Sequence, residues 1–119
     1  MVIRDAQRQT LQQSKQDDFV DRLMVHFQKV WPDQVTALGP AYRDWIAAGV
    51  VAASRYGLNT EQETARFVNL WFVWGRAFED VPEHRWAAII LHDKERQSHV
   101  KIHQLSYETK MRLAARKEE

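Results

Sequence analysis

Apolar residues recur every three to four positions along most of this chain, a spacing that predicts α-helices. No stretch between turn signals alternates apolar and polar residues for the length of a strand, so no sheet is expected. Breaks fall at Pro32, Gly39-Pro40, Gly57, Gly75 and Pro82, residue types that commonly begin or end helices. The pattern predicts an all-α fold, a compact single-domain bundle of five to six helices around a central apolar helix.

The best-defined helix start in the chain precedes its most apolar segment. Thr60 has the side chain of an N-cap residue, and Glu63 follows it at the spacing of a capping box. From Phe67 to Trp74, apolar residues occupy all sides of the predicted helix, interrupted only by Asn69. Because a helix that is apolar on all sides is usually buried, we expect this one to be the centre of the core.

Amphipathic stretches on either side predict the helices that pack around this centre. They cover residues 4–31, 33–38, 40–56, 82–92 and 98–116. In the last two, the residues expected to face inward are Trp86, Ile89, Ile90, Val100, Tyr107, Met111 and Ala114. Ile102, Leu105 and Leu113 flank the stripe of the last helix. Trp45 and Trp71 fall on core-facing stripes of their helices, so we expect both to be structural.

The two ends of the chain are more polar than the rest. Residues 1–16 are rich in glutamine and carry a thin apolar stripe that includes Ile3 and Leu11. Such a helix either projects and becomes ordered on a partner, or frays as a leader. We expect residues 117–119 to be a frayed tail and residues 1–119 as a whole to form one helical domain.

Composition narrows the cellular setting and the classes of partner. The chain has 119 residues, a single-domain length that can bury a core without disulfides or metals. It has no cysteine, which excludes disulfides and a cysteine nucleophile and fits a reducing compartment. The N-terminus lacks the apolar segment of a signal peptide, and no apolar run is long enough to span a bilayer. With a net charge of +1 and no concentrated basic face, we expect a cytoplasmic protein that binds neither membrane nor nucleic acid.

Two histidines offer the one metal-like spacing. His99 and His103 are four residues apart, so a helix would place both imidazoles on one face. The residues between them do not form an HExxH motif, and the nearest further ligands are His92 and Asp93. A solvated helix face explains the pair better than a metal does. We therefore predict neither a metal nor a cofactor, and keep a small metal-dependent enzyme as the less favoured alternative.

Other catalytic signatures are weak. The carboxylate pairs Asp17-Asp18 and Glu79-Asp80 are adjacent in sequence and show no sign of converging on a cleft. The serines lie in no nucleophile elbow, and the four scattered glycines cannot form a phosphate-binding loop. We therefore expect a non-enzymatic protein with no catalytic residues.

Aromatic and charged residues gather around the loop at residues 75–85. Aromatic residues and arginine are the types that dominate protein interfaces, so this loop is a candidate partner surface. The residues predicted to form the interface are Trp74, Arg76, Phe78, Glu79, Asp80, Arg85 and Trp86, with Ile3 and Leu11 from the N-terminal helix. The alternative interpretation is that the rings of the loop only hold it against the core.

Several segments resemble a known family. They are IRDAQ at residues 3–7, DRLMVH at 21–26, the break at Leu38 and Gly39, RYGLNTEQETARFVNLWFVWG at 55–75, and FEDVP with WAAIILHD between 78 and 93. Together they resemble small helical proteins encoded beside bacterial type VI secretion genes, near the spike, the PAAR tip and toxic effectors. The resemblance covers most of residues 3–93 and fades in the last helix.

The resemblance implies an accessory role without catalytic residues. It suggests an adaptor or co-chaperone that binds a secreted effector, or that helps to load it on the spike. An immunity protein that neutralises a co-encoded toxin is the alternative. The chain departs from the family at Arg76, where the family has a proline after the glycine that ends the central helix.

Overall fold

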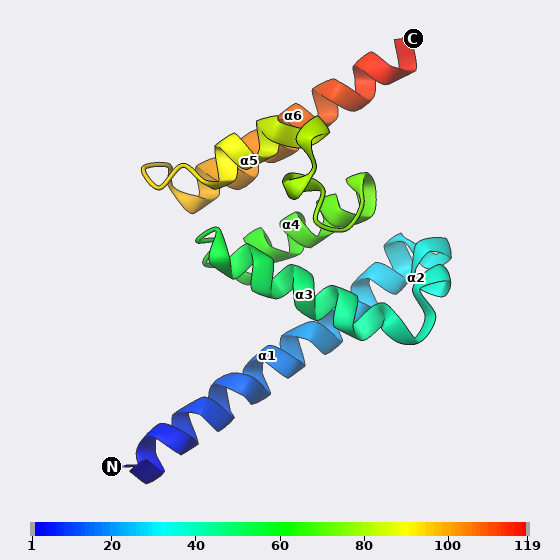
Figure 1. Cartoon of the computed structure of the whole chain (residues 1–119). Helices are drawn as coiled ribbons and strands as arrows, with labels where there is room; N and C mark the ends of the chain where they lie inside the picture. Colours follow the sequence, from blue (N-terminus) through cyan, green and yellow to red (C-terminus); the bar gives the residue numbers. More distant parts are fainter. Residues whose placement is uncertain (1, 119) are drawn as a thin grey trace. The chain divides into compact units, whose positions relative to one another are not determined.

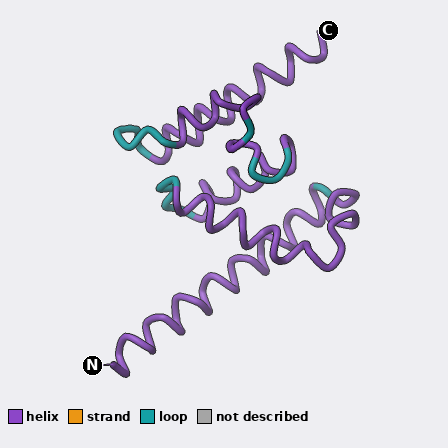
Figure 2. The backbone as a smooth tube through the Cα atoms, viewed as in Figure 1, coloured by secondary structure: helices purple, strands orange, loops and turns teal. Residues whose placement is uncertain are grey.

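The computed structural model describes the backbone of residues 2–118 and the side chains of residues 15–116. Within residues 2–118 the chain forms helices, turns and loops without a strand, which confirms the all-α prediction (Figure 1; Figure 2). The α-helices of this stretch are α1 (Val2–Val30), α2 (Pro32–Leu38), α3 (Tyr42–Arg55), α4 (Glu61–Trp74), α5 (Arg85–Leu91) and α6 (Ser98–Glu118). The shorter 3₁₀-helices are η1 (Gly39–Ala41), η2 (Phe78–Asp80) and η3 (Pro82–His84). None of the helices over this range is both long enough and apolar enough to cross a membrane.

Contacts within the chain group it into two units, Met1–Ala47 and Ala48–Glu119, with the boundary inside α3. The first unit contains α1, α2 and the first turns of α3. The second contains the rest of α3 and everything that follows. The single-domain organisation stays a prediction.

In the first unit, the apolar stripe of α1 supplies the core. Val20, Leu23 and Phe27 are buried, at the spacing that the sequence predicts. Tyr42 at the start of α3 is tied to α1 because its hydroxyl donates to the backbone carbonyl of Met24 at 2.7 Å. The side chains of Ile3 and Leu11 lie outside the described residues, so the predicted contacts of the N-terminal stripe stay predictions.

In the second unit, α4 is the buried centre that the sequence predicts. Its buried apolar residues are Phe67, Val68, Leu70, Trp71 and Phe72. The Thr60 hydroxyl accepts the backbone N–H of Glu63 at 3.1 Å, which confirms the predicted cap. The helix ends at Gly75, whose φ of +112° is a conformation that favours glycine.

The predicted inward face of α5 is wrong at one residue. Ile89 is 60% exposed, whereas Ala87, Ile90 and Leu91 are buried. Ala87, Ile90 and Leu91 share one face of α5 through their three- and four-residue spacing, and Ile89 points away from that face. Because apolar residues occupy both faces of this short helix, the sequence pattern does not decide which face is buried.

The predicted stripe of α6 is also wrong. Tyr107 and Met111 are 56% and 54% exposed, and the helix instead buries the flanking residues Ile102 and Leu105 together with Lys101 and Thr109. The two polar members of this face have partners. Lys101 Nζ donates to the backbone carbonyl of Tyr56 at 2.8 Å, and Thr109 Oγ1 accepts the Trp74 Nε1–H at 3.1 Å. Burial of these two side chains is tolerated because both are hydrogen-bonded.

Candidate functional site

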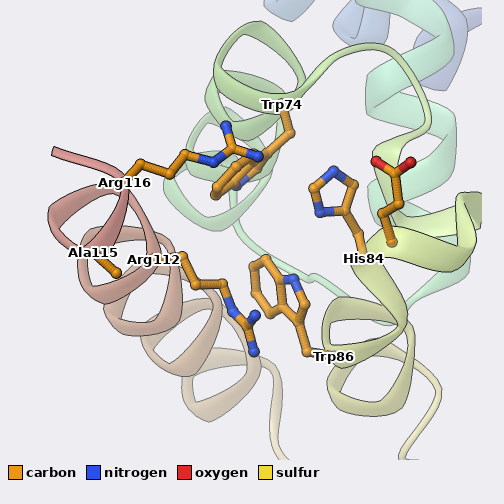
Figure 3. Close-up of a pocket in the computed structure, with 7 residues that line it drawn as sticks. Trp74, His84, Trp86, Arg112, Ala115 and Arg116 are labelled. Atoms are coloured by element: carbon orange, nitrogen blue, oxygen red, sulfur yellow. The ribbon is translucent and has the colours of Figure 1, made fainter. Parts of the chain in front are cut away.

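A cavity of about 310 Å³ lies in the second unit, beside the indole rings of Trp74 and Trp86 (Figure 3). We call it the aromatic–arginine cavity. Its lining residues are Trp74, Glu83, His84, Trp86, Arg112, Ala115 and Arg116. They come from the end of α4, from η3, from the start of α5 and from the last turns of α6.

Helix ends and turns bring these side chains together. Trp74 is the last residue of α4, after which Gly75 redirects the chain into η2 and η3. Trp86 follows in the first turn of α5, so eleven residues of sequence separate two indoles that meet in space. The contacts that α6 makes with both α4 and α5 then place its arginines beside the two rings.

The aromatic side of the cavity is a cluster of three rings. The Trp74 and Trp86 ring centroids are 6.2 Å apart and edge to face, and the His84 ring lies 5.0 Å from Trp74 and 6.2 Å from Trp86. Such edge-to-face arrangements are favoured by the ring quadrupoles. Because the Trp74 indole also donates to Thr109, its orientation is fixed from both sides.

The cationic side of the cavity consists of two arginines one helical turn apart. The Arg112 guanidinium lies 4.6 Å from the Trp86 ring centroid, and that of Arg116 lies 4.9 Å from the Trp74 ring centroid (Figure 3). Each is a cation–π contact, a type of interaction worth about 0.5–1 kcal/mol at exposed sites. A guanidinium carries several N–H donors, so a cation–π contact does not by itself use up its capacity to hydrogen-bond a ligand.

A second cavity, of about 460 Å³, lies next to the buried carboxyl group of Glu79, and we call it the Glu79 cavity. Glu79 is 3% exposed. Its two carboxyl oxygens accept the Tyr56 hydroxyl at 2.9 Å and the Trp71 Nε1–H at 3.1 Å. These hydrogen bonds attach η2 to α4 and to the turn after α3. They also hold Ala77, which has the unfavourable φ of +55°, in place.

The Glu79 network is built for structure rather than for proton transfer. Burial, followed by the hydrogen bond with Glu79, raises the pKa of Tyr56 well above its ordinary value. A tyrosine of this kind stays protonated at neutral pH and is a poor acid or base there. We therefore regard the network as a clamp on the loop.

The structure separates the predicted interface residues into three groups. Trp74 and Trp86 are half-buried and line the aromatic–arginine cavity. Phe78 and Glu79 are 1% and 3% exposed, so their prediction as interface residues is corrected, since both lie in the core. The exposed members of the set are Arg76 and Asp80, which line the Glu79 cavity, and Arg85, which lines neither cavity.

Sequence reasoning missed His84, Arg112 and Arg116 as members of a site. A signal did exist, because Arg112 and Arg116 are four residues apart and share one face of a predicted helix. Nothing in the pattern indicates that this face lies beside a loop about 30 residues earlier in the chain. The proximity of the helix face and the loop depends on tertiary packing.

The histidine pair proposed as a metal-like spacing is exposed. His99 and His103 both lie on the open side of α6. Among the residues with described side chains, no group of three or more His, Cys, Asp or Glu is arranged to hold a metal ion.

Comparison of the chain with models of protein families, with curated proteins and with solved structures finds no match.

Proposed function

We propose that this protein is a non-enzymatic accessory protein that binds another protein through the aromatic–arginine cavity. The observation that carries the proposal is the pair of half-buried tryptophans, each stacked against an arginine, on one surface of the second unit. Tryptophan and arginine are the residues most enriched among the few that dominate binding energy at protein interfaces.

The packing of these side chains supports the proposal further. The Trp74 indole is hydrogen-bonded to Thr109, and the rings of Trp74, His84 and Trp86 contact one another. Side chains that are ordered before binding lose little conformational entropy when a partner arrives. A rigid aromatic surface edged by cations therefore suits recognition of a preformed site on another protein.

The resemblance to proteins encoded beside type VI secretion genes supports the choice of partner. On that basis the partner is a secreted effector or a component of the spike, and the role is that of an adaptor or co-chaperone. The Glu79 network is consistent with a binding role, because it keeps the loop before Trp86 in one conformation.

Co-purification tests the proposal directly. The tagged chain is expressed with each neighbouring gene product, and the amount of captured protein is compared for the wild type, Trp86→Ala and Ile89→Ala. Ile89 is an exposed residue of the same helix that does not line the cavity, so it is a matched control. We expect W86A to reduce the captured fraction about tenfold or more, as removal of a dominant interface residue does.

Two results would contradict the proposal. One is capture of no gene product by the wild type. The other is capture that W86A and I89A reduce equally, which would move binding away from the cavity.

The adaptor and the immunity protein differ in one further outcome. An immunity protein protects cells from the co-encoded toxin after the secretion apparatus has been deleted, whereas an adaptor does not. The adaptor proposal predicts no protection in such cells.

A further inference from the structure

The aromatic–arginine cavity contains two guanidinium groups, of which one has no acidic partner among the described side chains and the other has an exposed one. Within the part of the chain whose side chains are described, Arg116 forms no ion pair. Arg112 pairs with Glu108 through its Nε at 3.4 Å, an exposed contact that leaves the terminal nitrogens of the guanidinium available. Exposed ion pairs of this kind contribute little, about 0–1 kcal/mol, so Glu108 does not compete strongly with a bound anion.

The contact of each arginine with an indole favours binding of an anion by its guanidinium group. Each guanidinium is restrained by its contact with an indole, and it presents N–H donors in a planar fork. Carboxylates match this fork and accept two parallel hydrogen bonds from it. Charge complementarity therefore favours a carboxylate over a neutral or cationic group.

The His84 ring, which lines the same cavity, has a buried nitrogen without a partner among the described residues. His84 lines the cavity, and its Nδ1 has almost no accessible surface and no hydrogen-bond partner in the structure. A buried polar atom without a partner costs about 1–3 kcal/mol.

The remaining lining fits an apolar neighbour of the carboxylate. Trp74, Trp86 and Ala115 supply apolar surface next to the arginines, and Glu83 is the one acidic residue of the lining. The volume, about 310 Å³, is at the lower end of the range for ligand pockets, about 300–1,000 Å³, and suits one or two side chains.

We propose that the aromatic–arginine cavity recognises an acidic peptide segment of the partner, with a glutamate or aspartate on Arg116 and Arg112 and an adjacent apolar side chain on the indoles. This inference rests on the proposed function and adds the chemical class of the bound segment. Lysine-rich segments are excluded by the two guanidinium groups, and neutral segments lose the bidentate hydrogen bonds.

Peptide binding to the full chain tests the inference. The probes are two capped hexapeptides labelled with fluorescein. In the glutamate peptide, a single leucine follows each pair of glutamates. In the matched glutamine peptide, each pair of glutamates is replaced by a pair of glutamines. Fluorescence anisotropy is measured with the wild type, Arg116→Gln and Lys110→Gln. Lys110 is exposed on the same helix and does not line the cavity, so K110Q controls for the loss of one positive charge.

We expect the glutamate peptide to bind the wild type at least tenfold more tightly than the glutamine peptide. R116Q should reduce this preference to threefold or less, and K110Q should leave it unchanged. Equal affinity for the two peptides, no saturable binding of the glutamate peptide, or the same effect of R116Q and K110Q would overturn the inference.

The amount of partner captured by the W86A and R116Q variants distinguishes this inference from the proposed function. If W86A abolishes capture and R116Q leaves it unchanged, the cavity binds a partner but not through a carboxylate, and only the inference fails. If neither variant affects capture, the proposed function fails as well.

Discussion

At the scale of the residue, Glu79 shows how tertiary contacts decide the role of a side chain. Its place in an acidic loop beside aromatic residues predicts an interface residue. In the structure its carboxyl group is instead buried and accepts hydrogen bonds from Tyr56 and Trp71. The sequence pattern identifies the loop. It cannot show which charged residue of the loop meets hydrogen-bond donors in the core.

Replacement of Tyr56 by phenylalanine tests this clamp. Loss of the hydroxyl leaves one oxygen of the buried Glu79 carboxyl group without its donor, so Y56F should lower the free energy of unfolding by about 1–3 kcal/mol near neutral pH. Urea denaturation followed by circular dichroism gives the value. Tyr107→Phe, at an exposed tyrosine, should change it by less than about 0.5 kcal/mol.

The effect of Y56F on stability should depend on pH in a known direction. The pKa of Tyr56 is raised in the folded state, so its contribution to stability is complete below the ordinary tyrosine pKa of about 10 and is lost as pH rises beyond that value. The stability difference between wild type and Y56F should therefore shrink from about pH 8 to about pH 11. A difference that stays constant or grows over this range would contradict the assignment.

At the scale of the element, helix starts and stops were predictable where local chemistry sets them. Thr60 caps α4 and Gly75 ends it, as the sequence indicates. The buried faces of α5 and α6 were not predictable from the sequence. Packing against η2 and α6 selects the face that α5 buries, and Lys101 and Thr109 of α6 have hydrogen-bond partners on distant segments. The positions of these partners depend on packing between helices.

Packing between α3 and α4 gives an element-scale prediction at Gly49. A Cβ at this buried position would lie 3.0 Å from Val68 Cγ2 and 3.5 Å from Trp71 Cε3. Overpacking costs about 1–3 kcal/mol, which exceeds the gain of up to about 1 kcal/mol from the better helix propensity of alanine. Gly49→Ala should therefore lower the free energy of unfolding by about 1 kcal/mol.

The cause can be isolated with a second substitution. Val68→Ala removes the atom that the new Cβ would meet, so in the V68A background G49A should be neutral or should stabilise the protein by up to about 1 kcal/mol. Thermal or urea unfolding of the four proteins completes the double-mutant cycle. An equal effect of G49A in both backgrounds would show that close packing is not why a glycine occupies this position.

At the scale of the whole molecule, two of the seven residues that line the aromatic–arginine cavity could be predicted. Trp74 and Trp86 were identified from the aromatic content of their loop, whereas His84, Arg112 and Arg116 were not. The arginines belong to the last helix, and only its packing against α4 and α5 brings them to the indoles. A site assembled from three helices and a 3₁₀ turn carries no linear motif.

Hydrogen exchange on the complex with the captured gene product tests the central claim most directly. Amide protection is measured on the full chain with and without that partner, and protection reports which backbone segments the partner covers or orders. We predict that protection increases at residues 74–86 and 108–116, which carry the aromatic–arginine cavity, and not at residues 99–103. Increased protection confined to other segments, or no change at residues 74–86 and 108–116, would contradict the account.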